Sequence, residues 1–131
     1  MSAEKAIKAL LDAHAPLTAV VPATRIYAGL IPVNTTLPAI AYNLISGLRP
    51  KDIGMNTLMT TSRIQVTVQT KTYATQKQII KLIRDACDAK QGTFGGTDVD
   101  SCIADIEGPD LRDDDFAIFM QTQDFIIKWR E

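Results

Sequence analysis

Three consecutive aspartates, Asp113, Asp114 and Asp115, are the residues of this sequence whose types and spacing most resemble a metal site. Carboxylate oxygens are the ligands that calcium and magnesium prefer, but the spacing of a calcium-binding loop is absent here. The alternative is a solvated turn, because a run of acids between two predicted strands commonly faces water. We expect the turn rather than a metal site.

The other residue types used in catalysis are scattered along the chain. Two cysteines and one histidine, Cys87, Cys102 and His14, do not form a recognisable zinc set. We expect both cysteines to be reduced, buried thiols. Ser46 and Ser101 lack the strand–turn–helix context of a nucleophile. We predict no catalytic residue, no metal and no cofactor, and therefore no enzyme; an unrecognised hydrolase is the remotest alternative.

Phosphate binding has one candidate motif, the glycines Gly92, Gly95 and Gly96. Phosphate cradles of this kind follow a strand and precede a helix, so that the helix N-terminus faces the anion. Here the glycines follow a predicted helix and precede a predicted strand. We therefore expect a turn at residues 92–98.

A long loop at residues 47–59 carries charged and apolar side chains between two predicted strands. Arg49 and Lys51 could contact phosphate or a protein partner, although Asp52 offsets their charge. With Arg63 they suggest an alternative function, an oligonucleotide-binding module, but an aromatic content of 6% offers no obvious base-stacking platform. We take as the candidate partner-contact loop Arg49, Lys51, Asp52, Ile53 and Met55.

The composition indicates one globular domain covering residues 1–131, since 46% of the residues are hydrophobic and 22% are charged. A formal net charge of -1 gives no basic surplus of the kind typical of nucleic-acid-binding domains. The N-terminal residues lack the apolar run of a signal peptide, and no stretch approaches the roughly 20 apolar residues of a membrane span. We expect a cytoplasmic protein without a membrane partner.

Charge is distributed unevenly along the chain. Residues 1–97 contain 11 Lys/Arg and 5 Asp/Glu, whereas residues 98–131 contain 3 Lys/Arg and 10 Asp/Glu. In one interpretation the two halves meet and neutralise each other within a monomer. In the other, a basic face of one subunit meets an acidic face of the next in a head-to-tail assembly. The sequence leaves both open.

The helices are predicted from apolar residues at helical spacing. A first helix begins after Ser2, a plausible N-cap, and ends at Pro16. It could dock on a partner, but we expect it to cover the core. A short helical turn is expected at residues 17–21 and a brief extended piece at residues 25–27. The strongest helix covers residues 73–90, with Thr75 as its cap and Gln78 completing a capping box.

Four strands are predicted from alternating patterns, with Ile64, Val66 and Val68 pointing inward from the second. The order helix-strand-strand-helix-strand-strand favours an α+β fold, a four-stranded antiparallel sheet with helices packed on one face. We expect the two hairpins to meet through the second and fourth strands. The four predicted strands cover residues 37–46, 62–70, 100–107 and 116–129.

Several segments, taken in order, resemble the tail-completion, or tail-terminator, proteins of long-tailed bacteriophages. The segments are Arg25-Ile26-Tyr27, Pro32, LPAIAYNLISG, RIQVTVQT, YATQKQIIKLIRDA and QTQDFIIKW. The resemblance extends from about residue 4 to residue 129, and it rests on order and spacing rather than on any single motif. It implies a structural protein without enzyme activity, with a small α+β fold. It also implies a ring, commonly hexameric, on the end of the tail tube.

The resemblance also implies partners. The ring would contact its own copies, the major tail-tube protein and the head connector, while genome DNA only passes through its channel. The protein would be made in the bacterial cytoplasm and then reside at the head-proximal end of the virion tail. A head-side stopper or another minor tail component is the alternative within this class. Asp113, Asp114 and Asp115 are candidates for lining the channel, where they would repel DNA phosphates, or for an interface.

Overall fold

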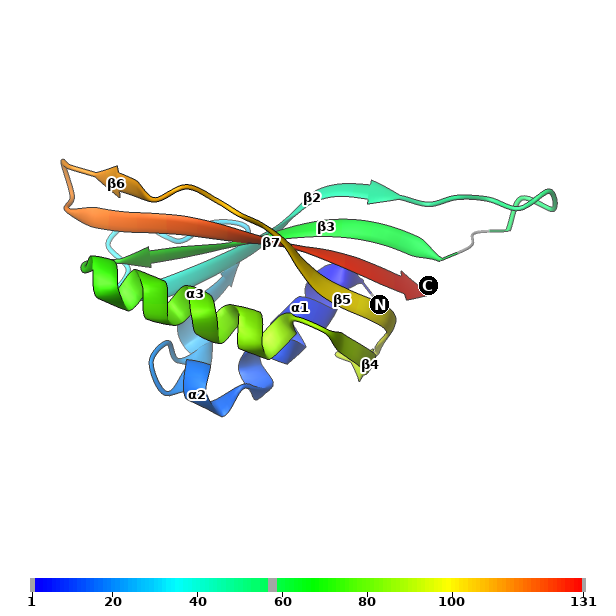
Figure 1. The fold of residues 1–131 in the computed structure, drawn as a ribbon, viewed down its shortest axis with the longest axis horizontal. Coiled ribbons are helices and arrows are strands. Elements are labelled where there is room, and N and C mark those ends of the chain that lie inside the picture. Colours follow the sequence, from blue (N-terminus) through cyan, green and yellow to red (C-terminus); the bar gives the residue numbers. More distant parts are fainter. Residues whose placement is uncertain (1, 57–58, 131) are drawn as a thin grey trace.

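The computed structural model describes residues 2–56 and 59–130. Within these ranges the chain forms one curled, mixed sheet of seven strands with three α-helices and a short 3-10 helix (Figure 1). The helices are α1 (Ala3–Ala13), α2 (Ala15–Thr18) and α3 (Tyr73–Cys87), with the 3-10 turn at Ala23–Arg25. The strands are β1 (Ile26–Ala28), β2 (Ala39–Leu48), β3 (Thr60–Thr70), β4 (Lys90–Phe94), β5 (Thr97–Glu107), β6 (Leu111–Asp113) and β7 (Ile118–Arg130).

The predicted α+β class is confirmed, but the four-stranded, purely antiparallel sheet is wrong. The strand order is β1-β2-β3-β7-β5-β4, with β6 pairing β7, and β1 runs parallel to β2 with Ile26 opposite Ile40. The three additional strands are short. β1 overlaps the extended piece predicted at residues 25–27, and β6 lies in residues 108–115, which we expected to connect two strands as a loop. β4 covers the end of the predicted helix 73–90, since α3 already ends at Cys87, and the start of the predicted turn at residues 92–98. Strands of three to five residues are too short to show clear alternation.

The centre of the sheet is the antiparallel ladder between β3 and β7. It runs without interruption from Thr60 opposite Trp129 to Thr70 opposite Phe119. This is the predicted meeting of the second and fourth predicted strands. Side chains alternate along both strands, so that one face is buried under the helices and the other is partly exposed.

The helices lie together on one side of the sheet (Figure 1). The hydroxyl of Ser2 accepts a hydrogen bond from the Lys5 backbone N–H at 3.2 Å, which confirms Ser2 as the cap of α1. Pro16 follows the end of α1 and lies in the first turn of α2. A missing N–H breaks no helical hydrogen bond at that position, so Pro16 is compatible with the start of a second helix. The cap of α3 is Thr72 rather than Thr75, and its hydroxyl accepts from the Thr75 N–H.

The core lies between the helices and the inward face of the sheet. Inward residues of β3, including Ile64, Val66 and Val68, are fully buried as predicted, and they share one cluster with Ile7 of α1 and Ile83 of α3. The first helix therefore covers the core.

The other face of β2 carries a separate, smaller cluster. Ala39 and Ala41 are buried there with Ile31, under the segment that connects β1 to β2. Their small side chains allow this segment to approach the sheet closely. The opposite face of the sheet is therefore partly covered at one end.

The glycine segment forms the tight turn between β4 and β5. Gly95 and Gly96 have φ values of +58° and +79° and connect Phe94 to Thr97, as in a two-residue hairpin that needs positive φ at both central residues. A Cβ at Gly95 would lie 2.7 Å from the backbone oxygen of Lys5 in α1. The turn thus lies against α1 and holds β4 to the helical layer.

Candidate functional site

The two sets of candidate residues lie at opposite ends of the molecule's long axis (Figure 1). At one end, β2 and β3 extend beyond the helices as an arm. Every residue from 44 to 56 is exposed. At the other end, Asp113 is the last residue of β6, and Asp114 and Asp115 lie in the turn that joins β6 to β7. Both sets were candidates from the sequence, but the sequence did not predict that they lie at opposite ends of the molecule.

The arm ends in a compact turn, residues 49–56, which we call the arm tip. The Asp52 carboxylate accepts a hydrogen bond from the Asn56 backbone N–H at 2.9 Å, and the Met55 N–H donates to the Asp52 backbone oxygen at 3.0 Å. Ile53 and Met55 consequently point into solvent, and Ile53 is 103% exposed. The predicted loop at residues 47–59 is shorter at its start, because β2 continues to Leu48; residues 57 and 58 lie outside the described ranges.

The acidic turn consists of Asp113, Asp114 and Asp115. The Asp115 backbone N–H donates to the Asp113 carboxylate at 3.0 Å, and Arg112 Nε lies 3.2 Å from the Asp114 carboxylate. The predicted turn is therefore present. In the described part of the chain, no group of three or more His, Cys, Asp or Glu side chains is arranged to hold a metal ion.

An open pocket of about 340 Å³, with a mainly apolar lining that also includes Asn34 and Thr35, lies next to the acidic turn. Two segments that are distant in sequence form most of its wall, the connection between β1 and β2 and the start of β7. Gln69 and Lys71, at the end of β3, complete it. No local sequence pattern predicts this pocket, because its two main segments are distant along the chain. The apolar lining residues are Ile31, Pro32, Val33, Leu37, Phe116 and Ile118.

Several ion pairs within the chain join basic residues of its first part to acidic residues of its last part. Arg63 lies 2.6 Å from the Asp105 carboxylate and 3.2 Å from that of Asp124. The hydrogen bond to Asp105 is the main cause that raises the Arg63 pKa. Arg63 is thus held by two carboxylates and is poorly placed to bind nucleic-acid phosphates.

Two further pairs connect α3 to the acidic half of the chain. Lys77 lies 2.6 Å from Asp110, and Arg84 lies 3.1 Å from Glu107. Each joins a basic residue before position 98 to an acid after it. For these side chains the two halves neutralise each other within the monomer, so the charge division alone is weak support for head-to-tail assembly.

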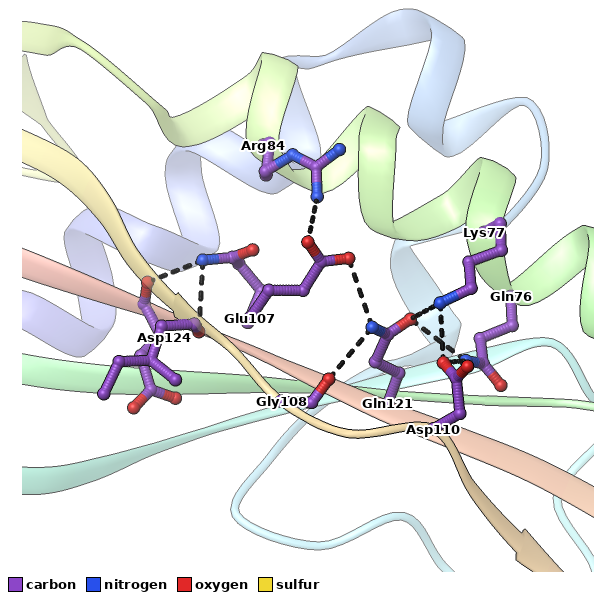
Figure 2. A network of polar contacts seen from close by, with 10 residues as sticks. Gln76, Lys77, Arg84, Glu107, Gly108, Asp110, Gln121 and Asp124 are labelled. Atoms are coloured by element: carbon purple, nitrogen blue, oxygen red, sulfur yellow. Dashed lines mark hydrogen bonds and ion pairs between the residues drawn. The ribbon is translucent and has the colours of Figure 1, made fainter.

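A polar network, missed by sequence analysis, fixes the chain between β5 and β6 (Figure 2). Buried Gln121 of β7 is its centre. Its side-chain NH₂ donates to the Glu107 carboxylate at 3.1 Å and to the Gly108 backbone oxygen at 3.0 Å. Its side-chain oxygen accepts from Gln76 at 3.0 Å and from Lys77 at 3.2 Å. The sequence feature that could have indicated this network is a glutamine at an inward-facing position in each of α3 and β7.

Asp110 extends the network to the first turn of α3. Its carboxylate accepts from Lys77 Nζ at 2.6 Å, from the Tyr73 hydroxyl at 2.7 Å and from Gln76 at 2.9 Å. The Lys77 bond, followed by the Tyr73 bond, lowers the Asp110 pKa below its usual 3.8. These contacts position the β6–β7 hairpin, and with it the acidic turn and one wall of the pocket.

The two cysteines are buried thiols, as predicted. Burial raises the pKa of Cys102 to about 12 and raises that of Cys87 well above its usual value. A protonated, inaccessible thiol is a poor nucleophile.

Comparison with known proteins shows a family and a likeness to solved structures. The family described as Tail completion protein gp17 matches residues 5–127. The fold is similar to that of a chain in the virion of a native gene transfer agent (GTA) particle, with a TM-score of 0.81 and 15% sequence identity over 99% of this chain and 96% of that chain. No curated protein matches the sequence.

No helix among residues 2–56 and 59–130 has the length and hydrophobicity of a membrane span.

The family match confirms the resemblance that the order of sequence segments indicated. Because the match covers nearly the whole sequence, this chain belongs to the tail completion protein gp17 family, which consists of structural, non-enzymatic phage proteins.

Proposed function

We propose that this chain assembles into a ring, of six copies as the family resemblance implies, at the head-proximal end of a phage tail tube. There it stops tube polymerisation and provides the joint to the head connector. The observation that carries the proposal is the family match over residues 5–127. The fold likeness to a chain of a gene transfer agent virion supports it.

The shape of the subunit is suited to this task. The arm and the acidic turn lie at opposite ends of one sheet, so each copy offers two different surfaces to its neighbours (Figure 1). Contacts between unlike surfaces repeat around an axis and close into a ring when the rotation closes. The remaining surfaces would contact the tail-tube protein on one side and the connector on the other, with DNA passing through the centre.

The same proposal gives the protein its location. It is made in the cytoplasm of the bacterial host and is incorporated into the virion when the tail is completed. The arm tip is a partner-contact surface in this proposal. The acidic turn lies either on the channel, where it would repel DNA, or in a contact between subunits.

Electron microscopy of tails made with and without this chain tests the proposal. With the chain, tails of uniform length should end in a ring and join heads. Without it, tubes should be overlong or irregular and separate from heads. Normal tails and infectious particles in its absence would refute the proposal.

A pull-down with the full-length chain separates the terminator from the other head–tail joining proteins. Capture of the tail-tube protein favours the terminator. Capture of only the portal-side adaptor favours a head-side stopper.

A further inference from the structure

The most exposed apolar side chains of the described residues gather in two places. Six large apolar side chains have exposed fractions between 66% and 103%. Isolated exposed apolar residues are ordinary, but clustered ones mark interaction sites. Three belong to the arm and three lie at or beside the pocket: Leu48, Ile53 and Met55, and Leu30, Val33 and Phe116.

The two places have complementary shapes. The arm tip is a projecting knob, in which the Asp52 turn presents Ile53 and Met55. The pocket is an open hollow of about 340 Å³ with a mainly apolar lining, which includes Val33 and Phe116. A knob and a hollow of the same apolar character bury the most surface when one enters the other.

The arm tip cannot enter the pocket of its own chain. The arm leaves the sheet near Thr60, at the start of β3, whereas Gln69 and Lys71 of the pocket lie at and beyond its end. The 11 residues of β3 separate these ends by about 35 Å at roughly 3.3 Å per residue. The strand continues through a paired ladder and does not bend back. Any contact between knob and pocket must therefore join two molecules.

Charges beside the two places are also complementary in balance. The arm tip has two cations and the acid Asp52, whereas the pocket side has three aspartates against Arg112, which pairs with Asp114, and Lys71, which lines the pocket. Arg49 and Lys51 come just before Ile53 in the arm tip. The three aspartates of the acidic turn come just before Phe116 at the edge of the pocket. Opposite charges flanking an apolar contact favour one orientation of the partners over others.

We propose that the arm tip of one copy inserts Ile53 and Met55 into the pocket of the next copy. Arg49 and Lys51 then face the acidic turn of that neighbour. The contact is head-to-tail, and its repetition links successive subunits. This inference rests on the proposed ring, and it assigns the acidic turn to the interface between subunits rather than to the channel.

A disulfide cross-link tests the contact. Both native thiols are buried, so an introduced cysteine is the accessible one. Ile53→Cys and Val33→Cys chains, each full length, are co-expressed with the other virion proteins, and the assembled particles are oxidised. We expect a disulfide-linked dimer of the two variants, identified by mass spectrometry. The matched control pairs Ile53→Cys with Ile106→Cys, an exposed apolar position on β5, and should give no such dimer.

Terminated tails that contain both cysteine variants but lack the Ile53–Val33 product would overturn the contact and leave the proposed ring intact. A product joining Val33→Cys to a different virion protein would overturn it too, because the pocket then has another occupant. Tails that terminate normally without the chain would instead refute the proposed function, so the two failures are distinguishable.

A second variant tests the same contact without cysteine chemistry. Ile53→Asp places a charge in an apolar pocket, and we expect loss of the ring from tails while the isolated chain keeps its melting behaviour. Ile106→Asp, on an exposed site outside both places, is the control and should retain the ring. Rings that form equally with both variants would overturn the proposal.

Discussion

The indole N–H of Trp129 donates a hydrogen bond to the hydroxyl of Ser62 at 3.0 Å. Both residues are 3% exposed, and they join β7 to β3 near the base of the arm. Trp129 is the single tryptophan of the chain. A buried N–H must find a partner, so this pair ties the end of β7 to the strand that leads into the arm.

Ser62→Ala should destabilise the protein by about 1–3 kcal/mol, because it leaves the indole N–H buried without its acceptor. Urea unfolding followed by circular dichroism measures the free energy of unfolding. The same change in a Trp129→Phe background should cost clearly less, since no indole N–H is left without an acceptor. Equal costs in the two backgrounds would show that the hydrogen bond contributes nothing.

Ile83→Asp should unfold the domain. Ile83 is fully buried in the cluster that joins α3 to the sheet, and an unpaired carboxylate there costs several kcal/mol. Gln78→Asp, at an exposed position of the same helix, is the control and should melt like the parent protein. A cooperative melt of Ile83→Asp at the parent temperature would contradict the assigned face of α3.

Asp110 should make stability depend on pH in the acid range. Its pKa is lowered in the folded state, so its contribution is fully present above its ordinary value of 3.8 and is lost as the pH falls through the lower, folded-state pKa. Asp110→Asn should remove this part of the pH dependence. Urea unfolding over a pH series measures it, and an unchanged slope in the variant would show that Asp110 is not the group responsible.

Cys87 and Cys102 should resist thiol reagents in the native protein. Burial raises both pKa values and excludes the reagent, so labelling requires unfolding. Mass spectrometry should show no label on the folded chain at mildly alkaline pH and two labels after denaturation, one for each cysteine of the sequence. Rapid labelling of either thiol before denaturation would show that the core around it opens readily.

Replacing residues 49–59 with an Asn-Gly turn should leave the domain folded and abolish assembly. Leu48 and Thr61 already face each other across the β2–β3 ladder, and the three residues Asn, Gly and Thr60 would then connect them, which is enough to close the hairpin. Calorimetry checks folding, and complementation with measurement of tail length checks assembly. Normal tail length with the shortened chain would exclude a role for the arm tip.

The sequence predicted the parts of the fold that have a long, regular pattern. The alternation of Ile64, Val66 and Val68 identified the inward face of β3, and the helical spacing around Ile83 identified α3. It failed for β4 and β6, which are too short to show a period. It also placed the α3 cap at Thr75, because Thr72 and Thr75 are equally good capping residues and only the backbone at Thr72 decides between them.

The candidate site was predicted in part. Two local clusters could be recognised in the sequence: the charged and apolar side chains between Arg49 and Met55, and the three aspartates. The sequence predicted that β3 pairs with β7, but no local pattern gives the register of that ladder, on which the placement of the two sets at opposite ends depends. The Gln76–Gln121 bond joins residues 45 positions apart, so its partners could not be matched from sequence alone.

The uninterrupted β3–β7 ladder has a mechanical consequence. Its hydrogen bonds lie across the strands, so a pull along the long axis loads them in shear, all together, instead of opening them one by one. Tension entering at one extremity would pass through the backbone to the other with little stretching. In the proposed ring, each subunit would thus resist stretching and help to keep the ring closed while DNA passes through it.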